Sequence, residues 1–146
     1  MENCQKTVSE VRQFLENVKR LLFQKGKVIV NNRPWANGKV NKTLAYMAET
    51  GIKQEDMECV INELQVCHYS YTDWDSNSKF PNEQFWFFGI TKKLVDQEEA
   101  LYIKLKIREI RGQSLLIMSF HPEQPSSPEL KLGFPYQDYQ SNIEGP

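Results

Sequence analysis

The sequence of 146 residues has few of the side chains that build disulfide scaffolds and metal centres, namely three cysteines and two histidines. Cys4, Cys59 and Cys67 form no C-x-x-C pair, and His68 and His121 lie 53 positions apart. A disulfide framework or a zinc ribbon needs more ligands at shorter spacing. We therefore expect reduced cysteines, no metal and no cofactor. Cys67 is open to two interpretations: a nucleophile paired with a histidine, or a buried strand cysteine.

Long apolar runs are also lacking. The longest, Phe85–Ile90, has six residues, far short of the ~20 that a membrane-spanning helix needs. The first seven residues, MENCQKT, contain no apolar signal core. We expect no membrane association, no export and a cytoplasmic location.

A net charge of one sign is absent as well, since 18 basic residues stand against 19 acidic ones. This balance provides no overall attraction to nucleic acid. The charge is unevenly distributed, because residues 121–146 hold five of the seven prolines, four acidic residues and one lysine. We predict a single domain over 1–120 and a proline-rich acidic tail over 121–146. The tail also carries Phe134, Tyr136 and Tyr139, which are suited to docking on the domain.

Apolar residues in the N-terminal half repeat with the 3.6-residue period of a helix. The clearest stripe runs from Val8 to Leu22, with Thr7 and Glu10 forming a capping box at its start and Gly26 beyond its end. Shorter helices are predicted over 43–50 and 54–64, and a short strand over 27–30.

From Cys67 onwards the period changes to two, which is typical of strands. The pattern predicts strands over 67–72, 84–91, 100–109 and 114–120, with a hairpin turn at 111–113. Helices followed by consecutive strands indicate an α+β fold, in which N-terminal helices pack on an antiparallel sheet of three or more strands.

The segment 100–109 alternates most regularly. One face carries the apolar residues Leu101, Ile103, Leu105 and Ile107. The other carries a phenol and three cations, Tyr102, Lys104, Lys106 and Arg108. Alternate strand residues point the same way at roughly 6.6–7 Å spacing, so a stripe of this kind can follow an RNA backbone. The alternative is the ordinary solvated face of an antiparallel sheet.

Two further residues fit the same chemistry. His121 ends the last predicted strand, which is expected to pair with the strand of Tyr102, and an imidazole there can transfer protons around a phosphate. Tyr71 offers a ring on which a base can stack. The alternatives are an exposed strand-end histidine and a tyrosine packed in the core.

Across 45–120, the hydrophobic pattern and the segment order resemble a known toxin family. The resemblance is carried by Gly51–Met57 leading to Val60–Leu64, by Leu101–Lys104 and by Leu116–Phe120. These segments resemble the motility quorum-sensing regulator (MqsR) family of type II toxin–antitoxin systems, whose members are RelE-like mRNA interferases. The resemblance implies a RelE-like fold, a metal-independent cytosolic endoribonuclease acting on mRNA through its 2′-hydroxyl, and a cognate antitoxin protein.

The resemblance also assigns positions. The family's strand tyrosine falls on Tyr102 and the neighbouring strand lysine on Lys104, while His121 stands where the family has a closing lysine. Two further positions differ from the family.

At the two further positions that differ from the family, Ser70 or Tyr71 stands where the family has a lysine, and Phe87 stands where it has a glutamine. We therefore carry two functional hypotheses. The first is a toxin-like mRNA interferase with Tyr102, Lys104 and His121 as catalytic residues. Its expected RNA-binding residues are Lys104, Lys106, Arg108 and Tyr71. The alternative is a catalytically silent relative on the same fold that inhibits by binding protein or nucleic acid, encoded by a phage or other mobile element.

Overall fold

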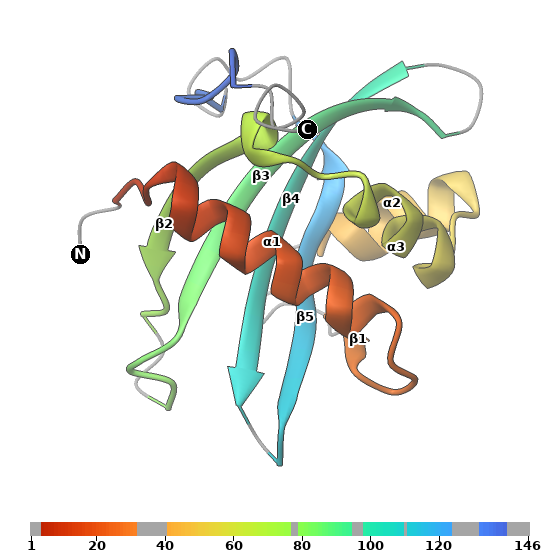
Figure 1. Ribbon diagram of the computed structural model, residues 1–146. Helices are drawn as coiled ribbons and strands as arrows, with labels where there is room; N and C mark the ends of the chain where they lie inside the picture. The colour runs from red at the N-terminus through yellow and green to blue at the C-terminus, as the bar shows by residue number, and fades with distance from the viewer. Residues whose placement is uncertain are drawn as a thin grey trace.

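A twisted five-stranded sheet, crossed on one face by a long helix, forms the centre of the computed structural model (Figure 1). The structure describes residues 4–31, 41–76, 79–94, 98–109, 111–123 and 132–139. The elements in chain order are α1 (Val8–Leu22), β1 (Val28–Val30), α2 (Lys42–Thr50), α3 (Gln54–Asn62), the 3₁₀ turn η2 (Val66–His68), β2 (Tyr69–Trp74), β3 (Gln84–Lys93), β4 (Glu98–Glu109) and β5 (Gln113–Pro122).

The sheet has the strand order β1-β5-β4-β3-β2. Strands β2 to β5 pair antiparallel with their neighbours in sequence, which confirms the predicted α+β fold. The whole sheet is mixed rather than antiparallel, because β1 pairs parallel with β5. Backbone hydrogen bonds from Leu115 N to the Lys27 carbonyl and from Asn31 N to the Ile117 carbonyl fix this edge.

Helix α1 begins and packs as its sequence predicts. Glu10 N donates to Thr7 Oγ1 at 3.2 Å and Thr7 N donates to Glu10 Oε1 at 2.8 Å, which completes the capping box. The ring of Phe14 stacks on Trp86 of β3 at a centroid distance of 4.0 Å. The buried face of the helix consists of Val11, Phe14, Leu15, Val18 and Leu21.

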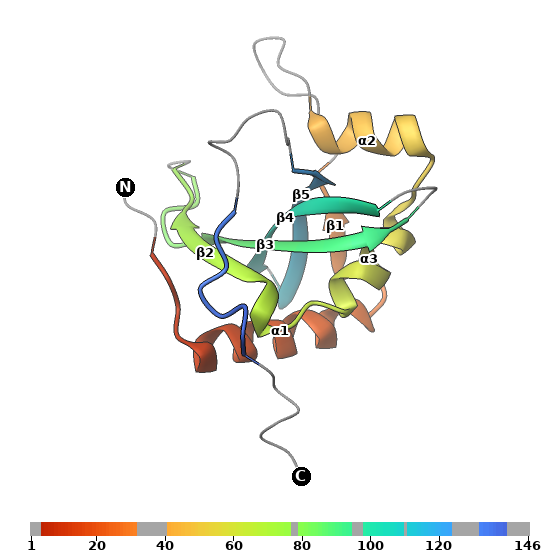
Figure 2. The same cartoon turned by 90° about the horizontal axis from the view of Figure 1, so that it is seen from above.

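The two shorter helices extend this arrangement around the sheet. Figure 2 shows α1 and α2 on opposite sides of the sheet. Helix α2 lies beside β5, where Phe120 N donates to Thr43 Oγ1 at 2.8 Å, and ends at Gly51, whose φ of 80° suits glycine. Helix α3 contacts α1. The helices predicted over 43–50 and 54–64 are confirmed, the second ending at Asn62.

The first strand of the antiparallel part starts later than predicted. Residues 67 and 68 belong to η2 instead of the strand, and β2 begins at Tyr69. The cause is local, because His68 N donates to the Gln65 carbonyl at 2.9 Å and Gln65 N donates to His68 Nδ1 at 2.9 Å. These two bonds fold the segment into a turn before the strand can start.

The hairpin between β4 and β5 lies where it was predicted. Glu109 pairs with Gln113 across it, and Arg111 and Gly112 take φ values of 55° and 95°. Positive φ at successive positions matches the right-handed twist of a hairpin, and glycine accommodates it at no steric cost.

The alternation of β4 separates the two faces of the sheet. Leu101, Ile103 and Leu105 are at most 1% exposed and lie in the core beneath α1. Because side chains alternate along a strand, Tyr102 and Lys104 project from the opposite side, which we call the outer face. The predicted core face of this strand is confirmed for these three residues, and Ile107 on the same face is partly buried against the core.

Replacing Ile103 with alanine should lower the free energy of unfolding by about 2–5 kcal/mol, because Ile103 is fully buried and its removal leaves a cavity. Urea denaturation measures the change. Ile29→Ala removes the same atoms from a side chain that is 52% exposed and should have a much smaller effect. Equal losses for the two variants would contradict the assigned core.

Candidate functional site

Four aromatic or imidazole rings form a row across the outer face, one from each antiparallel strand. Tyr71 of β2 stacks on Phe87 of β3 with centroids 4.2 Å apart. Phe87 meets Tyr102 of β4 edge-on at 6.0 Å, and Tyr102 stacks on His121 of β5 at 5.2 Å. The strand register supports these contacts, since Tyr71 is opposite Phe87 and Tyr102 is opposite His121. We call these four residues the ring row.

His121 has one ring nitrogen occupied and the other available. Its Nδ1 lies 2.9 Å from the Pro122 carbonyl oxygen. A carbonyl oxygen only accepts, so Nδ1 carries the hydrogen and Nε2 keeps its lone pair. Burial lowers the pKa of His121 below its usual value of 6.5, the Pro122 carbonyl opposes this effect, and Lys42 adds to it. At neutral pH, His121 is therefore an uncharged base.

Tyr102 holds its proton firmly. Burial raises the pKa of its phenol far above the usual value of 10, and the nearby Tyr71 and Glu123 raise it further. Tyr102 is therefore a hydrogen-bond donor, not an anion, at any physiological pH. The rings of Tyr102 and His121 thus combine a donor and a base on adjacent strands.

Lys104 is the cation nearest to this pair on its own strand, two positions beyond Tyr102. Its ammonium nitrogen lies 4.1 Å from the ring centroid of Phe85 and 5.5 Å from that of Phe87. Burial lowers its pKa, while Asp75 acts in the opposite direction. Within the described ranges, Lys104 forms no ion pair, in contrast to Lys106 on the same strand.

Lys106 and Arg108 lie on the predicted face, but both are engaged in an ion cluster. Lys106 is 1% exposed and binds the carboxylates of Asp75 and, at 2.8 Å, Glu83. Arg108 donates two hydrogen bonds to the carboxylate of Glu83, from Nε at 3.0 Å and from Nη2 at 3.1 Å. Both cations lie over the ring of Phe80. Burial and pairing leave Lys106 no exposed surface to offer a phosphate.

The acidic members of this cluster, Asp75 and Glu83, lie between β2 and β3, and no role was predicted for them from the sequence. They occupy the two ends of the segment that joins these strands, and Asp75 N donates to the Glu83 carbonyl at 2.9 Å. Two acids flanking a loop next to a cationic strand are the signal that indicates such pairing.

The C-terminal segment 132–139 docks on the domain, as its aromatic residues predicted. Tyr136 stacks on Tyr69 and donates its hydroxyl hydrogen to the Lys6 carbonyl at 2.5 Å. Arg12 of α1 donates to the hydroxyl of Tyr139. Residues 132–139 belong to the predicted tail 121–146, and they pack on the domain. The last strand, β5, ends at Pro122 and so extends two residues into the same range.

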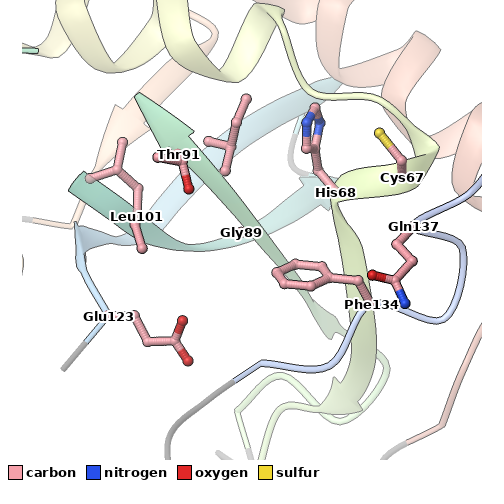
Figure 3. A pocket seen from close by; sticks show the side chains of 10 residues that line it. Cys67, His68, Gly89, Thr91, Leu101, Glu123, Phe134 and Gln137 are labelled. Carbon is pink, nitrogen blue, oxygen red and sulfur yellow. The ribbon is translucent and has the colours of Figure 1, made fainter. Parts of the chain in front are cut away.

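A cavity of about 410 Å³ opens between β3, η2 and this segment (Figure 3). Gly89 and Thr91 of β3, His68 of η2, Glu123, and Phe134 of the segment contribute to its walls. His68 Nδ1 accepts from Gln65, so its hydrogen lies on Nε2, and burial lowers the pKa of His68. Over the described residues, no group of three or more His, Cys, Asp or Glu is arranged to hold a metal ion.

Comparison with known proteins finds no counterpart. No protein family, curated protein or solved structure matches this chain. No helix in the part of the chain that the structure describes is long and apolar enough to cross a membrane. A functional assignment therefore depends on the geometry of the outer face.

The ion cluster predicts a pH-dependent contribution to stability. Burial raises the pKa of Glu83, but hydrogen bonds and charges from Arg108 and Lys106 outweigh this, so the net pKa is lowered. A lowered folded-state pKa stabilises the protein above the unfolded value of about 4.3, and this stabilisation is lost as the pH falls through the folded value. Glu83→Gln should lower the free energy of unfolding by about 1–3 kcal/mol at pH 7.

The difference between wild type and Glu83→Gln should shrink on acidification from pH 7 to pH 3, as measured by urea unfolding. Glu16→Gln makes the same change at an exposed position of α1 and serves as the matched control. A difference that is constant with pH, or that grows as pH falls, would contradict the charge pairing.

Proposed function

We propose that this chain is a metal-independent endoribonuclease that cleaves mRNA in the cytoplasm, similar to the MqsR-type toxins of type II toxin–antitoxin systems. The carrying observation is the pairing of Tyr102 with His121 on adjacent strands, with their rings 5.2 Å apart and the hydrogen of His121 held on Nδ1 by the Pro122 carbonyl. The resemblance of the segment order to that family supports the proposal and implies a cognate antitoxin protein as partner.

The chemistry follows from the protonation states of the two rings. Nε2 of His121 takes the proton from a ribose 2′-hydroxyl, and the 2′-oxygen forms a bond to the adjacent phosphorus. The bond from phosphorus to the 5′-oxygen of the next nucleotide breaks. Tyr102 donates a hydrogen bond to the phosphate and supplies the proton to the leaving 5′-oxygen, which as an alkoxide is more basic than a phenolate. The products are a 2′,3′-cyclic phosphate and a 5′-hydroxyl.

Lys104 and Tyr71 serve binding in this scheme. The ammonium of Lys104, which projects from the same face of β4 as Tyr102, stabilises the negative charge that develops on the phosphate oxygens. Tyr71 is half-buried at the β2 end of the ring row and offers its remaining surface to a base. Lys106 and Arg108 act indirectly, by holding Asp75 and Glu83 over the outer face.

One observation favours the second candidate, a catalytically silent relative that inhibits by binding protein or nucleic acid. The charges of Lys106 and Arg108 are met by Asp75 and Glu83, so the outer face is less cationic than its sequence indicates. A face of low net charge suits a protein partner as well as an RNA strand.

Purified protein should cleave a long single-stranded RNA in the presence of EDTA, leaving 5′-hydroxyl ends. His121→Ala should reduce the cleavage rate by about 10²–10⁴-fold, the usual contribution of a general base. Its affinity for RNA should change little, because the proposed role is proton transfer. Gel analysis of end-labelled RNA measures the rate, and filter binding measures the affinity.

His68→Asn is the matched control, since it removes the other histidine and keeps an acceptor for Gln65 N. It should cleave like the wild type. RNA binding without cleavage by the wild-type protein would support the silent relative, and the absence of both would overturn the RNA-directed proposal.

Lys104 should account for part of the salt dependence of RNA binding. For single strands, the slope of log affinity against log salt concentration is about −0.7 per neutralised phosphate. Lys104→Ala should therefore flatten this slope by about 0.7, measured by titration between low and physiological salt. Lys25→Ala removes the same charge from an exposed position after α1 and should leave the slope unchanged. Identical slopes for wild type and Lys104→Ala would exclude a phosphate contact there.

A further inference from the structure

The outer face has a gap in its side chains at Gly89, and another part of the chain fills that gap. Gly89 of β3 lies opposite Tyr102 of β4, so its missing side chain would project beside the ring row. A Cβ built at this position would lie 2.7 Å from Phe134 Cζ and 3.1 Å from Leu132 Cδ1. The Phe134 ring thus occupies the space that any side chain at position 89 would take (Figure 3).

Phe134 is held there by contacts made elsewhere in the segment 132–139. Leu132 N donates to Glu123 Oε2 at 2.6 Å at one end, and Tyr136 is bonded to the Lys6 carbonyl toward the other. Figure 2 shows the segment passing the β2–β3 side of the sheet toward α1. Gly133 and Pro135, which flank Phe134, are exposed. The two neighbours of Phe134 therefore leave no buried position when the ring withdraws.

The surroundings of this space suit a planar ring. Its floor is the backbone of Gly89, so a flat ring can lie directly on the sheet. The space over Gly89 adjoins Tyr102 on the neighbouring strand. It is bordered by Glu123, which lies two residues after His121. A base seated over Gly89 would belong to a nucleotide next to the phosphate that the Tyr102–His121 pair addresses. Single-stranded RNA is bound mainly by stacking unpaired bases on surfaces of this kind.

We propose that the space over Gly89 is a socket for an unpaired RNA base and that Phe134 is its intramolecular occupant. This inference rests on the proposed function, because it assigns a base subsite to the same face. The six-membered Phe134 ring matches a pyrimidine in size, so the socket takes a pyrimidine base. Phe134 competes with that base, and the apparent affinity for RNA falls by the fraction of molecules in which the socket is open.

The test uses full-length protein and two small probes, uridine 5′-monophosphate and ribose 5-phosphate, which differ only in the base. Phe134→Ala should bind uridine 5′-monophosphate at least about fivefold more tightly than the wild type, which is the gain expected when the socket is open in at most about one wild-type molecule in five. Ribose 5-phosphate should bind both proteins equally. Pro135→Ala, an exposed neighbour of Phe134, is the matched control and should behave like the wild type.

A second variant fills the socket instead of emptying it. Gly89→Ala combined with Phe134→Ala should cancel the gain in affinity, because the added methyl group occupies the floor. Circular dichroism verifies the fold of each variant, and titration calorimetry or ligand-observed NMR measures binding. If the protein carrying both substitutions still binds uridine 5′-monophosphate more tightly than the wild type, the socket proposal is wrong.

Equal affinity of Phe134→Ala and wild type for uridine 5′-monophosphate would also overturn it. The outcomes separate the two proposals. If the wild type cleaves RNA but Phe134→Ala shows no gain, the socket fails and the catalytic proposal stands. If Phe134→Ala binds uridine 5′-monophosphate more tightly but neither it nor the wild type cleaves RNA, the socket is supported and the catalytic proposal is wrong. The outer face then binds RNA without cleaving it.

Discussion

Strand β4 lies at the centre of the sheet, and its alternation imposes a constraint on every neighbouring element. Its apolar residues must be covered, which requires the amphipathic face of α1, and Ile103 is fully buried as a result. The residues between them must then project to the outer face, where water, charge partners or other rings have to satisfy them. Tyr102 and Lys104 are placed beside His121 by this alternation and by the register with β5.

A charged side chain on the same face of β4, that of Lys106, creates the second constraint. The position of Lys106 on β4 buries its ammonium, and a buried cation is tolerated only with paired acids. Asp75 and Glu83 supply them, so the β2–β3 connection folds back over the strand. The charge of Lys104 forms no such pair in the described part of the chain, so the two lysines on this face differ in their surroundings: acids around Lys106, aromatic rings around Lys104.

Features determined by near neighbours in sequence could be predicted, and those determined by distant ones could not. The capping box of α1 and the two faces of β4 involve residues within a few positions of one another, so periodicity and residue type predict them. The parallel register of β1 with β5 depends on tertiary packing, because the apolar run at 27–30 does not specify a partner. The same limit applies to the packing of Phe134 over Gly89, because these two residues lie far apart in the chain.

For the site, the strand pattern predicted that Tyr102, Lys104 and His121 share a face, and the register places two of their rings in contact. The sequence does not reveal protonation states, because they depend on burial and on single hydrogen bonds. His121 Nδ1 donates to a carbonyl, whereas His68 Nδ1 accepts from a backbone N–H, so the two histidines should be neutral in opposite tautomers.

This contrast provides the most direct test of the account, by ¹H–¹⁵N NMR of the histidine side chains at neutral pH, with and without single-stranded 2′-O-methyl RNA, which binds but offers no 2′-hydroxyl to cleave. We expect hydrogen on Nδ1 of His121 and on Nε2 of His68, and an RNA-induced shift of the His121 resonances. If saturating RNA leaves His121 unchanged, or if its hydrogen is found on Nε2, the assignment of His121 as the base that acts on RNA is wrong.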